Sequence, residues 1–161
     1  MQFDVLPAPF GALTAVFDGE GKLCELWTKD ASAQVSQRSR RDEGVSSLAR
    51  EEFDRYFAGE LTEFSIPLGI RGSGFQRQVW DLLMQIPYGQ TRTYGDLARK
   101  LGEPNAARAV GRANATNPIA IIVPCHRVIG ASGALTGYAG GLDIKRTLLE
   151  LEASRLGNLF S

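Results

Sequence analysis

The spacing of apolar residues is different before and after residues 69–74. This difference predicts two kinds of secondary structure in the two parts of the chain. Before the break, apolar residues form short runs, at residues 3–6, 13–17 and 23–28, and glycines separate the last two. Runs of this length between glycine-containing turns predict strands and a hairpin. After the break, apolar residues recur at helical spacing. The 161 residues suffice for two small domains with cores of their own.

We predict an α/β domain over residues 1–70 and a mostly helical domain over residues 71–161. In the first, the polar stretch 31–44 is interpreted as a surface loop. Residues 46–58 predict a helix, and residues 64–68 a further strand. The apolar side of that helix is expected to carry Leu48, Phe53, Tyr56 and Phe57.

Two short helices around a glycine-containing turn are predicted in the second domain, over residues 94–102 and 106–115. This pattern is typical of a helix-turn-helix. Ser73 is expected to cap an earlier helix over residues 75–85, and Asn105 to cap the second of the two. That second helix is rich in alanine, which is also compatible with a buried core helix carrying one exposed arginine, Arg108.

The chemistry of the chain centres on Cys125, which stands next to the only histidine, His126. A thiol acts as a nucleophile once ionised, and a neighbouring imidazole is a common means of ionising it. The imidazole needs an orienting carboxylate, and Glu152 and Glu150 are the candidates. A buried structural cysteine is the alternative interpretation, because free cysteines are often buried.

The net charge of zero conceals an uneven distribution. Residues 71–128 hold eight arginines and lysines against three acidic residues. A basic surface on a neutral protein can still bind phosphates, so nucleic acid is a candidate partner, held with modest non-specific affinity.

The sequence shows no run of apolar residues of transmembrane length and no basic leader, which favours a cytoplasmic, soluble protein that binds no membrane. We expect it to be a monomer in solution. A reactive Cys125 also favours a reducing compartment. Cys24, Cys125 and His126 provide no two spaced ligand pairs, so we expect no metal.

Three motifs surround the cysteine: Pro-Cys-His-Arg-Val at 124–128, Asn117-Pro118 before it, and Gly-Tyr-Ala-Gly-Gly-Leu at 137–142. Through these motifs, residues 89–152 resemble the O6-alkylguanine-DNA alkyltransferases. This resemblance implies a ribonuclease-H-like N-terminal domain and a single-turnover methylated-DNA–protein-cysteine methyltransferase. Such a protein removes alkyl groups from guanine O6, and from thymine O4, by irreversible transfer to its own cysteine, and it needs no cofactor.

The resemblance also implies residue roles. Cys125 is the nucleophile, His126 takes its proton through a water, Glu152 orients the imidazole, and Tyr94 donates a hydrogen bond to a purine ring nitrogen. His126 and Glu152 are together expected to lower the pKa of Cys125. Arg127 is expected to make structural contacts.

The partner implied is double-stranded DNA, bound through the minor groove with the damaged nucleotide flipped out. Arg108 would fill the gap in the base stack, and Asn117 would hold the hinge between the DNA-binding helix and the reactive segment. The remaining residues expected at the DNA are Ala107, Gly111 and Arg112. Those expected at the substrate are Val128, Tyr138, Ala139 and Ala120. Some relatives carry serine in place of Ala139. Some carry proline in place of Ala120, and the alanine at position 120 is expected to leave a roomier alkyl pocket.

Three other functions remain open at this stage. A helix-turn-helix regulator would keep Cys125 inert, and a lesion-binding relative would bind without reacting, although such proteins replace the cysteine. A cysteine hydrolase would need an oxyanion site, for which the sequence offers no motif. Transfer of a labelled alkyl group to Cys125 distinguishes these functions.

Overall fold

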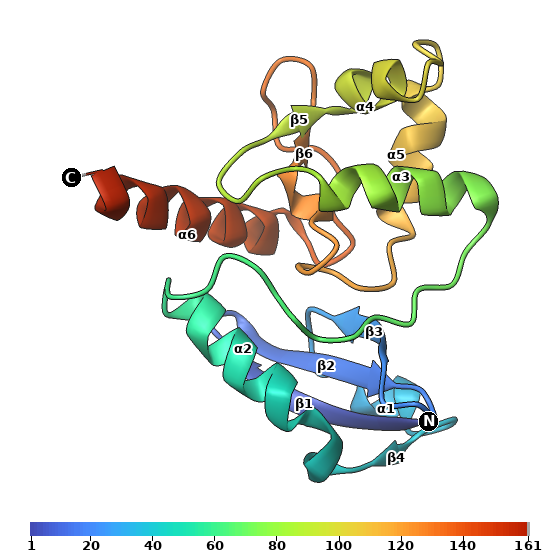
Figure 1. Cartoon of the computed structure of the whole chain (residues 1–161), viewed down its shortest axis with the longest axis vertical. Helices are drawn as coiled ribbons and strands as arrows, with labels where there is room; N and C mark the ends of the chain where they lie inside the picture. The colour runs from blue at the N-terminus through green and yellow to red at the C-terminus, as the bar shows by residue number, and fades with distance from the viewer. Residues whose placement is uncertain (161) are drawn as a thin grey trace. The chain divides into compact units, whose positions relative to one another are not determined.

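The computed structural model describes residues 1–160, with side chains described through Arg155. Its chain divides into two compact units (Figure 1). The N-terminal unit comprises Met1–Arg71 together with Pro118–Ala120, and the C-terminal unit comprises Gly72–Asn117 and the residues from Ile121 onward. Residues 118–120 therefore belong to the N-terminal unit, although the residues on either side of them in the sequence belong to the C-terminal unit.

A mixed sheet forms the base of the N-terminal unit, with strand order β3-β2-β1-β4. Its strands are β1 (Gln2–Ala8), β2 (Gly11–Phe17), β3 (Leu23–Trp27) and β4 (Arg40–Arg41). The first three pair antiparallel, as the apolar runs predicted, while β4 pairs parallel with β1. Asp18 closes the β2–β3 turn by accepting hydrogen bonds from the N–H groups of Glu20 and Lys22.

The interpretation of residues 31–44 as a surface loop was wrong. This stretch contains the one-turn helix α1 (Ser32–Val35), strand β4 and the start of the 3₁₀ helix η1 (Glu43–Ser46). Ala31 and Val35 are fully buried and pack in one cluster with Phe3 and Val16. Two apolar side chains four residues apart are too few to signal a helix, yet they suffice to hold the stretch against the sheet.

Helix α2 (Ser47–Phe57) confirms the helix predicted over residues 46–58. Its buried face differs from the prediction, because Leu48 is 42% exposed whereas Glu52 is buried. The Glu52 carboxylate accepts hydrogen bonds from the N–H and the hydroxyl of Ser65, both at 2.8 Å. The backbone near Ser65 thus pairs with a side chain, and the strand predicted over residues 64–68 is reduced to an isolated bridge from Leu68 to Leu23.

The C-terminal unit is built on helices that begin at well-formed caps. Helix α3 (Gly74–Met84) starts with the predicted cap Ser73, which forms a capping box with Gln76. Helix α4 (Tyr94–Lys100) starts with an equivalent box between Thr93 and Asp96.

Helices α4 and α5 (Ala107–Ala115) pack against each other and confirm the predicted helix pair. The cap predicted at Asn105 was wrong, because the N-cap residue of α5 is Ala106, which makes no side-chain capping hydrogen bond. The Trp80 indole N–H donates to the Ala113 carbonyl at 2.9 Å and so ties α3 to α5.

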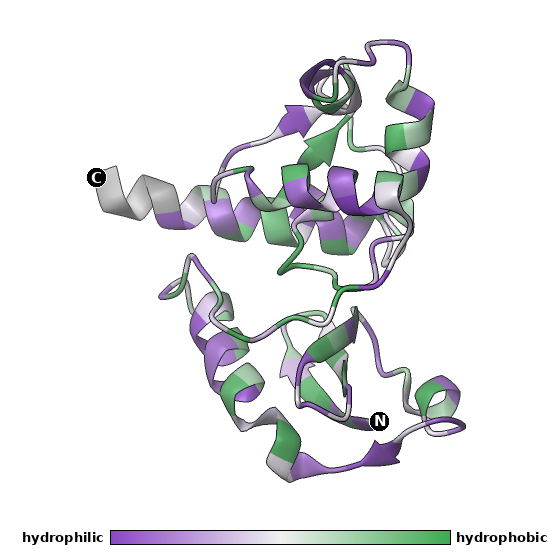
Figure 2. Ribbon diagram, turned by 45° about the vertical axis from the view of Figure 1, so that its right-hand side comes forward, coloured by the Kyte–Doolittle hydropathy of each residue, from purple (hydrophilic) through white to green (hydrophobic). Residues whose placement is uncertain are grey.

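Two short parallel strands, β5 (Arg92–Thr93) and β6 (Val128–Ile129), join the start of α4 to the segment after the cysteine. Figure 2 shows their contrast, with β5 hydrophilic and β6 hydrophobic. The unit ends in helix α6 (Leu142–Phe160). Within residues 1–160, no helix is long and apolar enough to cross a membrane.

Thr14 provides a stability test of the N-terminal unit. Its buried hydroxyl donates to the Lys29 carbonyl and accepts from the Ala31 N–H, both at 2.7 Å. Thr14→Val keeps the shape but leaves both backbone groups unpaired, at a cost of about 1–3 kcal/mol for each group. Urea unfolding should therefore show a clear loss of stability. Thr14→Ser, which keeps the hydroxyl, should lose much less, and equal losses in the two variants would contradict this account.

Candidate active site

Cys125 lies at the start of a short 3₁₀ helix, η2 (Cys125–Arg127), immediately after Pro124. The apolar residues 121–123 that precede it are buried, and Cys125 itself is 7% exposed. Cys125 is thus held by a packed segment, with a small part of its surface open to solvent.

The backbone of this segment is strained at Ile121, which has a φ of 72°. A β-branched residue rarely occupies this left-handed region, and the cost is on the order of 1–3 kcal/mol. Ile121 directly follows residues 118–120 of the N-terminal unit, and Ile119 forms a bridge with Leu26 of β3. The strain therefore falls where the chain returns from that unit to the reactive segment.

Glu152 and His126 form a buried pair, with Nε2 and Oε2 2.8 Å apart. Arg127 also binds the carboxylate, through Nε at 2.8 Å and Nη2 at 3.0 Å. The Gly89 N–H donates to the same carboxylate at 3.3 Å. The rival candidate, Glu150, is exposed on α6. The structure therefore brings Glu152, and not Glu150, to His126.

The protonation states of this pair follow from their surroundings. Burial raises the pKa of Glu152, but the hydrogen bonds and charges of His126 and Arg127 lower it by more, so its pKa lies far below the ordinary range. Burial lowers the pKa of His126, and Glu152 only partly offsets this. At neutral pH the carboxylate is ionised and the imidazole is neutral.

An ionised Glu152 accepts a hydrogen bond from the N–H at His126 Nε2. Because the neutral ring carries its one proton on Nε2, Nδ1 is the basic nitrogen. His126 Nδ1 is buried and has no hydrogen-bond partner among the side chains described, through Arg155. The lone pair of Nδ1 is therefore not used in a hydrogen bond. A base that takes the proton of the Cys125 thiol needs such a nitrogen.

The expectation that His126 and Glu152 lower the pKa of Cys125 was wrong for the resting protein. Burial raises the pKa of the thiol, while hydrogen bonding to Asn117 and the charge of Lys145 lower it by less. Cys125 is therefore a neutral thiol at neutral pH, and it must lose its proton when it reacts.

Lys145 is a site residue that sequence reasoning missed. It is fully buried on α6, and its Nζ donates to the carbonyls of Val128, at 2.6 Å, and Thr136, at 2.7 Å. The ammonium thus joins β6 to the loop that carries Tyr138. The signal was present in the spacing, because Lys145, Leu148 and Glu152 recur at helical intervals along one buried face.

Tyr94 contacts that loop at Thr136, and Tyr138 belongs to the loop itself. The Tyr94 hydroxyl, at the start of α4, lies 3.4 Å from both the carbonyl and the hydroxyl of Thr136. The Tyr138 hydroxyl is buried, and burial together with its proximity to Cys125 raises its pKa well above the ordinary value. Ala139, next in the chain, is exposed.

Asparagines connect the DNA-binding helix predicted from sequence to the reactive segment. Asn117 donates from Nδ2 to the Val123 carbonyl at 2.7 Å, in keeping with the predicted hinge. Asn114, which sequence reasoning did not single out, is buried on α5 and donates to the Cys125 carbonyl at 3.5 Å. The end of α5 is therefore hydrogen-bonded to the backbone of Cys125.

The remaining predicted residues separate into two groups. On α5, Arg108 and Arg112 are exposed one turn apart, and Ala107 and Gly111 are half-buried beside them. Ala120 lies in the N-terminal unit, where its N–H donates to the Leu26 carbonyl at 3.4 Å. A proline at position 120 has no N–H and would lose that hydrogen bond. The structure therefore disfavours Ala120→Pro.

Family models match both parts of the chain. Residues 1–70 match "6-O-methylguanine DNA methyltransferase, ribonuclease-like domain". Residues 74–154 match "6-O-methylguanine DNA methyltransferase, DNA binding domain". The chain belongs to the 6-O-methylguanine DNA methyltransferase family. Membership confirms the ribonuclease-like N-terminal fold and the family that the motif around Cys125 indicated.

Relatives of this methyltransferase family cover nearly the whole chain. The methylated-DNA–protein-cysteine methyltransferase of Mycobacterium tuberculosis H37Rv is 52% identical over 159 residues, which cover 96% of this chain and 94% of that protein. The protein of the same name from Methanosarcina acetivorans is 48% identical, covering 96% and 99%. The crystal structure of M. tuberculosis OGT in complex with DNA superposes with a TM-score of 0.88 at 51% identity, covering 96% and 94%.

Replacing Glu152 tests the buried cluster of this family member. Glu152→Gln should lower the rate of alkylation of Cys125, because it removes the charge that holds His126 Nε2–H. It should also destabilise the fold, by on the order of 3 kcal/mol, because it leaves the buried Arg127 without its anionic partner. Glu150→Gln, on the exposed side of the same helix, is the matched control and should change neither property.

The sign of the pH dependence follows from the lowered pKa of Glu152. Its stabilising contribution is complete above the ordinary value of 4.5 and is lost as the pH falls toward the folded-state pKa. Urea unfolding at decreasing pH should show that Glu152→Gln flattens the acid loss of stability. A larger effect from Glu150→Gln on rate or stability would contradict the assignment.

Proposed function

We propose that this protein repairs DNA directly, by moving the alkyl group of O6-alkylguanine onto the sulfur of its own Cys125. Family membership supports this function. The observation that carries the assignment to this site is a neutral His126, the residue after Cys125, which is fixed on ionised Glu152 and has a buried, unoccupied Nδ1.

In this reaction the Cys125 sulfur attacks the alkyl carbon as that carbon's bond to O6 breaks. The thiol proton passes to His126 Nδ1, through a water molecule. The departing guanine gains negative charge, and the Tyr94 hydroxyl donates a hydrogen bond to the purine ring nitrogen. The product is a stable thioether, so each molecule acts once and needs no cofactor.

The residues around Cys125 recognise the flipped base. Backbone groups near Val128 are positioned by the Lys145 ammonium, which binds the Val128 carbonyl directly. Tyr138 lies beside the thiol, and the amide of Ala139 remains available for O6. The same site accepts O4-alkylthymine.

The partner is double-stranded DNA containing the lesion, bound by the protein as a monomer. The solved complex of M. tuberculosis OGT with DNA supports this partner. Residues 71–161 carry both DNA binding and alkyl transfer, and residues 1–70 form a separate domain. Arg108 and Arg112 project from α5 toward the minor groove, where the half-buried Ala107 and Gly111 allow close approach. Arg108 fills the gap left by the flipped nucleotide, and Asn117 holds the turn between α5 and the reactive segment.

A non-catalytic lesion-binding protein, or a helix-turn-helix regulator, would use the same DNA-binding helix. Neither would need a basic His126 nitrogen next to Cys125. Because a reactive thiol survives best under reducing conditions, we also place the protein in the cytoplasm.

The deciding experiment is intact-mass measurement after incubation with duplex DNA containing O6-methylguanine. One protein molecule should gain the mass of one methylene group, located on Cys125 by peptide mapping. Cys125→Ser should abolish the gain while retaining binding to the duplex, and Cys24→Ser should leave it unchanged. Binding without any mass gain would favour the non-catalytic alternatives, and a gain on Cys24 would overturn the site.

Arg108→Ala tests the proposed extrusion of the nucleotide. Unstacking a base costs a few kcal/mol, so losing the side chain that fills the gap should slow repair in duplex DNA by on the order of tenfold or more. Transfer from free O6-benzylguanine needs no unstacking and should slow far less. The exposed Arg77 of α3 is the matched control, and equal slowing of both substrates by Arg108→Ala would refute the role.

A further inference from the structure

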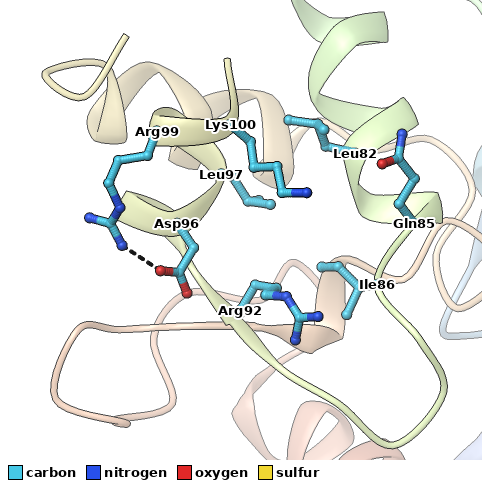
Figure 3. A pocket seen from close by; sticks show the side chains of 8 residues that line it. All are labelled: Leu82, Gln85, Ile86, Arg92, Asp96, Leu97, Arg99 and Lys100. Carbon is cyan, nitrogen blue, oxygen red and sulfur yellow. Dashed lines mark hydrogen bonds and ion pairs between the residues drawn. The ribbon is translucent and has the colours of Figure 1, made fainter. Parts of the chain in front are cut away.

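A cavity of about 670 Å³ opens between the end of α3, strand β5 and α4 (Figure 3). Its lining comprises Leu82, Gln85, Ile86, Arg92, Asp96, Leu97, Arg99 and Lys100. All of these residues belong to the C-terminal unit, and none of them comes from α5 or from the segment around Cys125. The cavity is therefore a separate feature from the alkyl-transfer site.

The rim of the cavity is cationic, with Arg92, Arg99 and Lys100 against Asp96 alone. The Asp96 carboxylate is already engaged, because it accepts a hydrogen bond from the Thr93 N–H at 2.8 Å and forms an ion pair with Arg99. Two positive side chains, Arg92 and Lys100, thus remain in excess, which favours an anionic ligand.

Arg92 is held in place for such a ligand. Its Nη1 donates to the Thr91 carbonyl at 2.8 Å, and its Nη2 donates to Gln90 Oε1 at 3.0 Å. Lys100 is the last residue of α4 and is exposed. One fixed and one adaptable cation therefore border the same opening, as Figure 3 shows.

Between these charges the wall is apolar, formed by Leu82, Ile86 and Leu97. Ile86 and Leu97 are each 3% exposed and so form a rigid base, while Leu82 is half-buried and reaches the opening. A DNA backbone is bound mainly by charge and hydrogen bonds and gains little from such a wall. A peptide that combines acidic and apolar side chains matches both parts of the cavity.

We propose that this cavity docks an acidic peptide segment of a partner protein, with carboxylates at Arg92 and Lys100 and one apolar side chain against Leu82. Because the lining excludes α5, such a partner can be bound while the DNA-binding helix and Cys125 stay available. The site would thus attach this repair protein to another protein without consuming its reactive thiol.

The test measures fluorescence anisotropy of a labelled Asp-Asp-Asp-Leu-Phe peptide titrated with the full-length protein. Binding should be saturable and should weaken as salt is added, because the rim contacts are charged. Lys100→Glu places a like charge against the peptide and should weaken binding by about tenfold or more. Arg77→Glu changes the charge of the protein equally but lies outside the cavity, and it should bind like the wild type.

Two further peptides separate the parts of the cavity. Asn-Asn-Asn-Leu-Phe lacks the charges and Asp-Asp-Asp-Ser-Ser lacks the apolar group, so each should bind several-fold more weakly than the complete peptide. Equal binding by Asp-Asp-Asp-Ser-Ser would show general charge attraction and overturn the proposal. Absence of saturable binding, or equal effects of Lys100→Glu and Arg77→Glu, would also overturn it.

Undamaged duplex DNA supplies the remaining comparison. If Lys100→Glu weakens duplex binding as much as peptide binding, the cavity belongs to the DNA surface and the peptide proposal fails. Alkyl transfer from free O6-benzylguanine to Cys125 should be unchanged in Lys100→Glu. This readout establishes that the variant is folded and tests the alkyl-transfer function independently of the peptide.

Discussion

The ionised Glu152 carboxylate organises the reactive half of this protein. One buried anion binds the imidazole of His126, the guanidinium of Arg127 and the N–H of Gly89. Arg127 in turn donates to the Ile86 carbonyl at 2.8 Å. Helix α6, the short helix at Cys125 and the chain after α3 are therefore fixed by a single charge. A buried carboxylate is stable only when hydrogen bonds and opposite charges offset its loss of hydration. Removing one of these partners therefore weakens the others.

A second set of hydrogen bonds connects helix α5 to the segment around Cys125. Trp80 ties α3 to the end of α5, and Asn114 and Asn117 extend from that end to the backbone around Cys125. The strained Ile121 lies in the same stretch. A strained backbone persists only where neighbouring contacts determine its path, and these asparagines together with the buried residues 121–123 provide them. The position of Cys125 thus depends on α5 remaining in place.

The features that could be predicted from the sequence are those determined by residues close together in the chain. The β2–β3 turn depends on residues close in the chain, as does the Ser73 cap, and the motif at Cys125 identified the family. The features it missed depend on distant partners. The side chain of Glu52 is buried because it binds Ser65, and Lys145 because it binds two carbonyls. The raised pKa of Cys125 arises from burial, which no neighbouring residue in the sequence reveals.

That burial has a chemical consequence for a protein that reacts once. An exposed thiolate would react with oxidants and stray electrophiles, each of which would consume the molecule. Here burial keeps Cys125 protonated, while His126 is held neutral with Nδ1 ready to accept a proton. The carboxylate of Glu152 is already ionised, so the imidazolium that forms has its counter-ion in place. Under the proposed mechanism, activation requires the transfer of only one proton, from Cys125 to His126, once an alkylated base is bound. The same low-dielectric surroundings that suppress the resting thiolate strengthen the Glu152–His126 attraction at that moment, so that selectivity and reactivity have a common physical origin.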